Sequence, residues 1–438
     1  MSVLGDKIKK LRKEKGLTQL ELVDNNVSRS MLSLIENGLT NPSMTTLQYI
    51  ADKLEKPLAY FLVDSYEVSE ECESLIASVE QLAQSKKYEE VIKEINAFNQ
   101  QSLNSNFSYL TNRQSGILHY LLGFSFFSLN QPDAQKHLLE AEALLLKAES
   151  SLYLCKTYHQ LSTLMFNEKN YDKIEEYLLK ADALISTVTI DNIHLKYNIT
   201  YNLALCYYRQ QKYENAIQLI NSILLYCREY EMHHNYGNFN MLLALAYKNN
   251  NQISNALECN FTAIRYYDFI IDPFIKHRCY VNISILYRLS KDSYNAIYYV
   301  NESIKYFEGI NNTKYLINAR IEKLINMLVF DIDSSDIADM AKVLLRHKDV
   351  DSLARGELLC ILGCLELKEK NYMMSLSLLQ EAEALIQDNI NSEMNIYLYE
   401  GLRKIYSQLE KTTEQALYQD KVSALLLQRP YYKDFLGN

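Results

Sequence analysis

The arrangement of apolar and polar residues predicts helices along the whole chain. Near the N-terminus, apolar residues recur every three or four positions, as at Leu4, Ile8 and Leu11, which is the spacing of one buried helix face. Such segments are separated by helix start and stop signals, among them the N-cap Thr18 and the glycine Gly38. The pattern predicts five short helices within residues 1–63.

The second and third of these helices are separated by a short turn, and the third is rich in small polar side chains. It is the segment "SRSMLSLIEN", which begins at Ser28 and has Leu32 and Ile35 on its apolar side. A helix that enters the major groove of DNA needs short side chains for close approach, and donors or acceptors for base edges. The pattern therefore predicts a helix-turn-helix that binds double-stranded DNA. The predicted contacts are Gln19, Ser28, Arg29, Ser30 and Ser33, and a module used only for protein contacts is the alternative.

Farther along the chain, the hydrophobic pattern repeats with a period near forty residues. Segments such as "YENAIQLI" (213–220) and "ISNALECNFTAI" (253–264) start in the same way, and each follows an amphipathic helix with a small residue beside a large one. The small residue lets two helices approach closely, while the large side chain fills the groove between them. The aligned copies have anchor residues at Val91, Ala134, Ile174, Ala216, Ala256, Ala296, Ala338, Ser375 and Ala416. This steady period predicts a solenoid of about nine helical hairpins.

Composition supports an all-α chain with more than one domain. Only 11 Gly and 5 Pro interrupt 438 residues, and this length exceeds what one hydrophobic core usually serves. Residues 1–63 carry nine Lys and Arg against seven Asp and Glu, although the whole chain has a net charge of −9. A slightly basic head tolerates the DNA backbone, whereas the acidic remainder repels it. We expect a DNA-binding domain at 1–63, a linker at 64–70 and a repeat domain at 71–438.

The sequence lacks the motifs of enzymes, cofactor sites and membrane proteins. The 8 His and 8 Cys show no metal-ligand spacing, and no phosphate-binding loop or nucleophile elbow occurs. We therefore predict no catalytic residue, no metal and no cofactor. The Cys lie within apolar helical patterns, which favours buried reduced thiols, core packing for Cys360 and Cys364, and a cytoplasmic location. No signal peptide is recognised, and no apolar run reaches the roughly 18 residues of a membrane span.

The head resembles a known family of DNA-binding domains. The segments "IKKLRKEKGLTQLEL", "SRSMLSLIENG" and "PSMTTLQYIADKL" are similar to the phage-repressor type of helix-turn-helix that many bacterial regulators carry. In that family, the positions of the five predicted contacts face DNA, and those of Arg12 and Glu36 form a structural ion pair. The family's turn usually contains a Gly and one more residue than the "VDNNVS" of this chain, and Leu34 stands where a polar residue is usual.

The repeats also resemble a known family. Their small, large and aromatic order, clearest in "NLALCYYRQQKYENAI", is similar to the tetratricopeptide repeat (TPR) over roughly residues 70–430. This resemblance implies a right-handed α-solenoid whose first helices line a concave groove for an extended peptide. The residues at inward-pointing positions, with their neighbours, are the implied peptide contacts: Lys156, His159, Gln160, Asn198, Tyr201, Asn202, Asn238, Arg278, Asn282 and Arg320. Asn amides suit a peptide backbone and Arg suits a carboxylate, and a solvated polar face is the alternative.

A DNA-reading head on a TPR body resembles the Rgg/NprR/PlcR type of Gram-positive cytoplasmic peptide-pheromone receptor. The resemblance implies a transcription regulator that is a homodimer or a higher oligomer and is not an enzyme. It also implies that a short re-imported signalling peptide occupies the groove and changes how the heads engage DNA. The alternative is a TPR protein-interaction regulator whose main ligand is a protein partner such as a response regulator.

Overall fold

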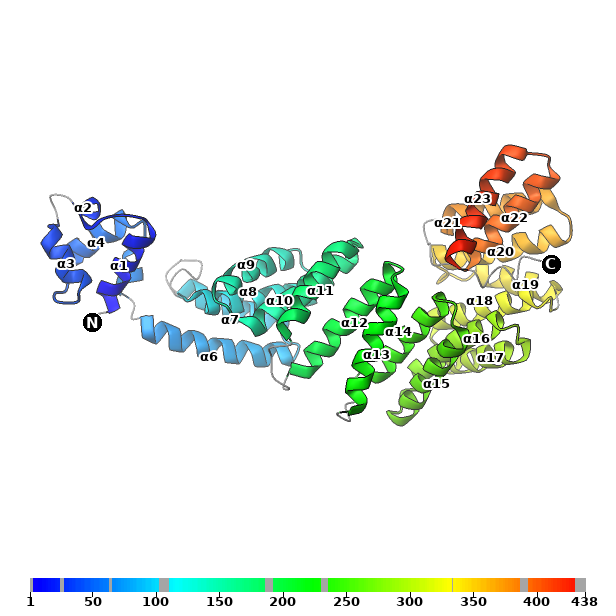
Figure 1. The fold of residues 1–438 in the computed structure, drawn as a ribbon, viewed down its shortest axis with the longest axis horizontal. Coiled ribbons are helices and arrows are strands. Elements are labelled where there is room, and N and C mark those ends of the chain that lie inside the picture. Colours follow the sequence, from blue (N-terminus) through cyan, green and yellow to red (C-terminus); the bar gives the residue numbers. More distant parts are fainter. Residues whose placement is uncertain are drawn as a thin grey trace. The chain divides into compact units, whose positions relative to one another are not determined.

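The chain folds into helices throughout the part that the structure describes. This computed structural model describes residues 3–23, 27–62, 65–101, 110–185, 192–229, 235–332, 334–386 and 393–429. Their regular structure is entirely helical, which confirms the predicted all-α class (Figure 1). The chain divides into two compact units: the N-terminal unit is Met1–Ile199 and the C-terminal unit is Thr200–Asn438.

The first five helices form a small head with its own hydrophobic core. They are α1 (Val3–Glu14), α2 (Gln19–Leu22), α3 (Arg29–Glu36), α4 (Met44–Lys53) and α5 (Leu58–Leu62). The core includes Ile8, Leu22, Leu32 and Ile50, which are fully buried. The predicted five-helix head is therefore confirmed.

The start and stop signals in the sequence explain where the head helices begin and end. The Thr18 side chain accepts a hydrogen bond from the Glu21 amide, and the Glu21 carboxylate accepts one from the Thr18 amide, so α2 begins with a complete capping box. The Ser28 side chain caps α3 in the same manner. Gly16 and Gly38 follow α1 and α3 with φ of 71° and 69°, a left-handed conformation that glycine adopts without steric cost.

After the head, the described helices form nine consecutive pairs, as the period of the sequence predicts. They are α6 (Ser65–Gln84) with α7 (Tyr88–Gln101), α8 (Asn112–Ser128) with α9 (Ala134–Lys147), α10 (Ser151–Glu168) with α11 (Tyr171–Ile185), α12 (Ile193–Arg209) with α13 (Tyr213–Glu229), α14 (Tyr236–Asn249) with α15 (Ile253–Phe269), α16 (Pro273–Leu289) with α17 (Ser293–Gly309), α18 (Thr313–Val329) with α19 (Ser334–Leu345), α20 (Ser352–Lys368) with α21 (Tyr372–Ile386), and α22 (Met394–Gln408) with α23 (Thr412–Gln428). The boundary between the two units falls within α12.

The anchor residues lie in the first turn of the second helix of each pair. Seven of the nine side chains are at most 2% exposed: Val91, Ala134, Ile174, Ala216, Ala256, Ala296 and Ser375. In α19 the alignment is one residue off, because Ile337 takes the buried position and Ala338 is half-buried. In α23 the anchor Ala416 is exposed, since no later helix of the described chain packs over this last hairpin.

The eight cysteines are free thiols in this structure. Six are buried, as the sequence predicts, but Cys259 and Cys364 are only half-buried. Cys360 lies one turn before Cys364 in α20 and is fully buried within the apolar core of the last repeats. The prediction of core packing is thus confirmed for both: Cys360 lies within this core, and the half-buried Cys364 packs against it.

The hairpin turns place non-glycine residues in a left-handed conformation. Such residues occur just after many of the helices, for example Asn130, Gln211, Asn251, Ile271, Lys291, Asn311, Asp331, Lys370 and Glu410. Asn tolerates this conformation, but a β-branched residue does not. Ile271, with φ of 56° and a side chain that is 85% exposed, therefore holds strain and gains little from burial.

Replacing Ile271 with Gly is expected to raise the free energy of unfolding of the C-terminal unit by about 0.5–1 kcal/mol. The relief of left-handed strain, roughly 1–2 kcal/mol, exceeds the added backbone entropy of the unfolded glycine, about 0.5–1 kcal/mol. Urea denaturation followed by circular dichroism measures the change. The matched control is Ile270→Gly, where φ is −87° and glycine has no advantage, so this variant is expected to be less stable. Equal changes in the two variants would contradict the strain at Ile271.

Candidate nucleic-acid and ligand interfaces

The helix α3 presents one polar face to solvent and one apolar face to the core of the head. Leu32 and Ile35 are at most 1% exposed, which confirms the predicted apolar side. Arg29 and Ser30 are exposed at the start of the helix, and Ser33 is half-buried one turn later. Arg29 makes no ion pair within the described residues, so its guanidinium is available to a partner.

A buried ion pair fixes α3 against α1. The Arg12 guanidinium donates two hydrogen bonds to Glu36, from Nε to Oε1 at 2.6 Å and from Nη2 to Oε2 at 2.9 Å, and a third to the Leu17 carbonyl at 2.8 Å. Gln19 donates from Nε2 to the same carboxylate at 2.8 Å. Burial acts to raise the pKa of Glu36, but the hydrogen bonds from Arg12 and Gln19 outweigh it and hold that pKa below its usual range. The structural ion pair implied by the family is confirmed.

These contacts divide the predicted DNA-binding residues into two groups. Gln19 and Ser28 already act within the head, because the Gln19 amide bonds Glu36 and the Ser28 hydroxyl accepts from the Met31 amide at 3.1 Å. Arg29 and Ser30 have no such internal bond within the described residues. Arg29 and Ser30 are therefore the side chains on α3 that are best placed to read bases.

The N-terminal unit contains the first four of the predicted peptide contacts. Lys156 is half-buried on α10, with Nζ 4.6 Å from the centre of the Tyr153 ring. His159 lies one turn later, and burial lowers its pKa to about 4, so it is neutral at pH 7. Gln160 is 5% exposed, and its amide nitrogen finds no hydrogen-bond partner within the described chain. Asn198 is exposed on α12.

The C-terminal unit contains the other six predicted contacts, and three of them lie close together. The positive charge of Arg278 on α16 acts on Tyr201 of α12, although burial has the larger effect and raises the pKa of Tyr201. Asn238 on α14 accepts a hydrogen bond from the Tyr267 hydroxyl at 2.8 Å. Tyr267 also interacts electrostatically with Tyr201. Helices α12, α14, α15 and α16 thus contribute one polar and aromatic cluster.

The remaining predicted contacts differ in whether their polar groups already have partners within the protein. The Arg278 guanidinium lies 5.4 Å from the centre of the Tyr315 ring, which orients it by a cation–π contact. Arg320 on α18 is paired with Glu308 at 2.6 Å, so a ligand carboxylate there would have to displace or share that partner. Asn202 and Asn282 are half-buried on α12 and α16.

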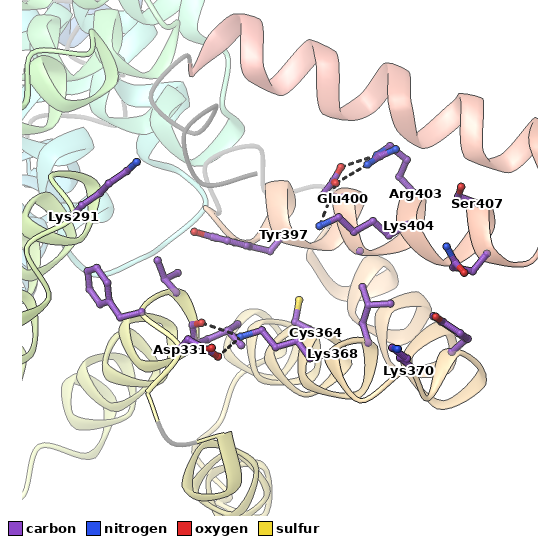
Figure 2. Close-up of a pocket in the computed structure, with 17 residues that line it drawn as sticks. Lys291, Asp331, Cys364, Lys368, Lys370, Tyr397, Glu400, Arg403, Lys404 and Ser407 are labelled. Atoms are coloured by element: carbon purple, nitrogen blue, oxygen red, sulfur yellow. Dashed lines mark hydrogen bonds and ion pairs between the residues drawn. The ribbon is translucent and has the colours of Figure 1, made fainter. Parts of the chain in front are cut away.

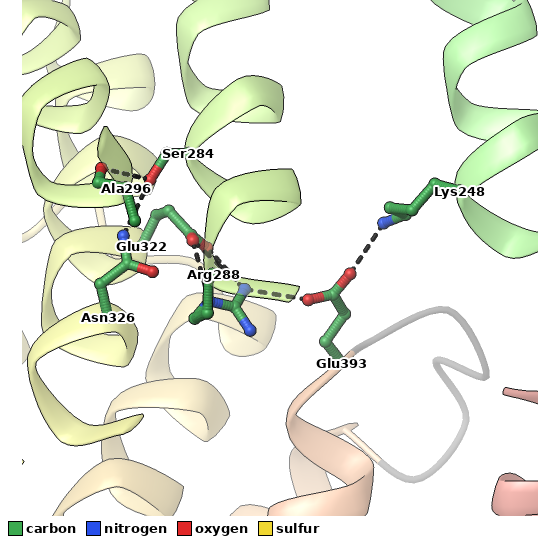
Figure 3. A network of polar contacts seen from close by, with 7 residues as sticks. All are labelled: Lys248, Ser284, Arg288, Ala296, Glu322, Asn326 and Glu393. Atoms are coloured by element: carbon green, nitrogen blue, oxygen red, sulfur yellow. Dashed lines mark hydrogen bonds and ion pairs between the residues drawn. The ribbon is translucent and has the colours of Figure 1, made fainter. Parts of the chain in front are cut away.

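Sequence reasoning missed a buried charge cluster that ties α22 to three earlier helices (Figure 3). Glu393, next to the start of α22, accepts hydrogen bonds from Lys248 of α14 at 2.7 Å and from Arg288 of α16 at 2.9 Å. Arg288 also donates to Glu322 of α18, at 3.2 and 3.3 Å. The side chains of Arg288 and Glu322 are 1% and 7% exposed. Four charges that are far apart in sequence therefore neutralise one another inside the C-terminal unit.

The two carboxylates of this cluster titrate in opposite directions. Burial raises the pKa of Glu322 to about 7, against the opposing attraction of Arg288. Burial acts in the same sense on Glu393, but Lys248 and Arg288 outweigh it and hold the pKa of Glu393 well below its usual range. Glu393 has the shorter bonds, so Glu322 is the carboxyl that takes up a proton. Its contribution to stability is therefore lost as the pH rises from its unfolded pKa, near 4.5, towards 7.

Comparison with known proteins supports the head and the repeats separately. Residues 8–61 match the helix-turn-helix family. The immunity repressor protein of Bacillus phage phi105 is 34% identical over 93 residues, which are 21% of this chain and 64% of the repressor. The chain thus spans just under two thirds of the length of that curated relative.

Solved structures show that the repeats have a known fold. The apo form of the quorum sensor NprR from B. thuringiensis is 15% identical, with a TM-score of 0.57, covering 82% of this chain and 99% of NprR. The apo form of RapI is 11% identical, with a TM-score of 0.61, covering 83% of this chain and 98% of RapI. The predicted TPR-like solenoid is confirmed, and the chain matches in fold the type of receptor that its sequence resembles. In the described residues, no helix combines the length and apolar character required to cross a lipid bilayer.

Proposed function

We propose that this protein is a cytoplasmic quorum-sensing transcription regulator. Its helix-turn-helix binds operator DNA, and a short re-imported signalling peptide in the concave groove of the TPR-like domain switches that binding. The observation that carries the proposal is the exposed polar face of α3, with Arg29 and Ser30 uncommitted within the described head, on a chain whose repeats share the fold of the quorum sensor NprR. The protein is not an enzyme in this proposal.

The peptide acts through its different affinity for two shapes of the solenoid. A ligand shifts a conformational equilibrium only as far as it binds one state better than the other. Each repeat contributes a small rotation, so a change at the groove is transmitted along the stacked hairpins. One head binds a few base pairs weakly, whereas two heads joined in a homodimer raise each other's effective concentration on DNA. Specific operator binding therefore requires at least a dimer.

Replacing Arg29 with Ala is expected to weaken specific DNA binding by about 1–3 kcal/mol for each head, roughly 5- to 150-fold in affinity. An arginine that bonds a guanine in the major groove provides about this much discrimination. Operator fragments selected from genomic DNA by the wild-type protein serve as probes in fluorescence anisotropy. The matched control, Arg346→Ala, removes the same exposed side chain from the body and is expected to leave the affinity unchanged. If Arg29→Ala binds as tightly as this control, Arg29 does not read bases.

Replacing Asn282 with Ala is expected to weaken binding of the signalling peptide by about 1–3 kcal/mol. The Asn amide both donates to and accepts from a peptide backbone, and its removal leaves peptide groups unpaired. Isothermal titration calorimetry with the peptide recovered from the native protein measures the loss. The control Asn295→Ala removes an amide that bonds Asp292 in the turn before α17, and it is expected to keep the wild-type affinity. Equal affinities for all three proteins would remove Asn282 from the peptide site.

The direct test of the proposed function is native mass spectrometry of the protein purified from its own host at high cell density. A dimer that carries the added mass of about five to ten residues supports the proposal and identifies the peptide. A dimer that instead retains a second protein favours the protein-interaction regulator. A monomer with no bound peptide that fails to bind any genomic fragment would contradict both.

A further inference from the structure

The last repeats form an open cavity that none of the predicted peptide contacts lines. The cavity has a volume of about 850 Å³, within the range of about 300–1,000 Å³ typical of ligand sites. Figure 2 shows the side chains that line it. Its walls are the C-terminal part of α18, the end of α20 and one face of α22, and Lys291 approaches from the turn after α16. All of these elements belong to the C-terminal unit.

The rim of the cavity is positively charged, although the chain has a net charge of −9. Five cationic side chains line it, against two carboxylates: Lys291, Lys368, Lys370, Arg403 and Lys404, against Asp331 and Glu400. Both carboxylates are already paired, since Asp331 lies 2.9 Å from Lys368, and Glu400 lies 2.7 Å from Arg403 and 3.7 Å from Lys404. Lys370 has no ion-pair partner within the described residues. The cationic side chains thus outnumber the carboxylates around the cavity, which favours an anionic ligand.

The floor of the cavity is apolar, with one polar group that lacks a partner. Leu328, Val329, Phe330 and Leu367 line this part. The Tyr397 hydroxyl is buried here and has no hydrogen-bond partner in the described chain. Burial raises the pKa of Tyr397 to about 12, so the hydroxyl keeps its proton and can donate it in a hydrogen bond. A buried donor without a partner costs free energy until a ligand supplies an acceptor.

We propose that this cavity binds the acidic end of a short peptide. The carboxylate lies among Lys368, Lys370 and Lys404, and an adjacent apolar side chain of the peptide covers the floor beside Tyr397. The apolar floor favours a peptide over inorganic phosphate, which has no apolar part to bury. This inference rests on the proposed function and names the peptide's chemical class.

The experiment is an affinity selection with the full-length protein and a synthetic library of random heptapeptides with free C-termini, read by mass spectrometry. The test variant is Lys368→Gln/Lys404→Gln, in which both replaced side chains are exposed and lie on the cavity rim. The matched control is Lys342→Gln/Lys348→Gln, which changes the net charge equally at exposed positions outside the cavity. The wild type and the control are expected to enrich peptides with Asp, Glu or an exposed terminal carboxylate. The test variant is expected to lose that preference.

The strongest selected peptide is then compared with its amidated, Asn- or Gln-substituted analogue by fluorescence polarisation. The acidic peptide is expected to bind the wild type at least ten times more tightly than the analogue, and the difference is expected to vanish in the test variant. Raising the salt concentration from 0.1 to 1 M is expected to reduce this difference in affinity, which checks the same interaction without mutation. This inference is overturned if the selected peptides show no acidic preference, or if the test variant keeps the same acidic preference as the wild type. Either result leaves the proposed function intact. If the wild type selects no peptide, this inference and the peptide-switched function are both overturned. If inorganic phosphate then stabilises the wild type but not the test variant, the cavity is a site for that anion instead.

Discussion

Replacing Arg288 with Met is expected to lower the free energy of unfolding of the C-terminal unit by about 3–5 kcal/mol. The change removes the cation that bonds both Glu322 and Glu393, and it leaves two buried carboxylates with Lys248 alone. Breaking a buried ion pair on one side costs this much because the remaining charge is neither hydrated nor neutralised. Urea denaturation of the full-length protein, followed by circular dichroism, measures the loss.

The control adds Glu322→Gln to the same variant. This double variant leaves Glu393 paired with Lys248 and no unpaired carboxylate, so part of the lost stability is expected to return. The pH gives a second check: in the wild type, the contribution of Glu322 falls as the pH rises towards 7, and in a Glu322→Gln variant that part of the pH dependence is expected to disappear. A loss below about 1 kcal/mol for Arg288→Met alone would show that the cluster is held by packing and not by its charges.

Replacing Arg12 with Ala is expected to unfold the head. The Glu36 side chain has no exposed surface, and without Arg12 it keeps only the hydrogen bond from Gln19. The cost, about 3–5 kcal/mol, is comparable to the whole stability of a domain of about sixty residues, roughly 3–9 kcal/mol. Limited proteolysis and DNA binding report on the head, and we expect rapid cleavage within residues 1–62 together with loss of DNA binding.

The matched control replaces both partners, Arg12→Met with Glu36→Leu. An apolar pair of similar volume leaves no buried charge, so this variant is expected to resist proteolysis far better than Arg12→Ala. Specific DNA binding should then return, because Arg29 and Ser30 on α3 are unchanged. An Arg12→Ala head that is cut no faster than the wild type would contradict a stabilising role for the pair.

The fold was largely predictable because its signals are local. The head helices begin at capping residues such as Thr18 and Ser28. Each repeat is marked by a buried residue, most often a small one, that recurs about every forty positions. The alignment failed where that signal weakens. In α19, Ile337 and Ala338 are both apolar, so the sequence does not say which one faces the core. In α23, Ala416 has the expected residue type, but no following helix of the described chain covers it.

The sites were less predictable because they combine residues that are far apart in the chain. The exposure of Arg29 follows from the apolar face of its own helix, so the sequence alone could predict it. The cluster around Arg288 could not be found this way, because its partner Glu393 lies 105 residues away. The sequence also does not distinguish the lysines that line the cavity from lysines that only stabilise a helix end. Lys368 ends α20, and a lysine at a helix C-terminus is common simply because it complements the helix dipole.

The buried cluster also sets the order in which parts of the C-terminal unit can fold during synthesis on the ribosome. Repeat arrays usually fold by adding neighbouring units, but Lys248 meets its partner only 145 residues later in the chain. At about 5–20 residues per second, α14, α16 and α18 emerge well before Glu393 is synthesised. Until then Lys248 lacks its partner Glu393 and Arg288 has only Glu322, and the closing contact must wait for a long loop to be formed. We therefore expect a nascent chain cut short before Glu393 to lack the contacts that close this cluster.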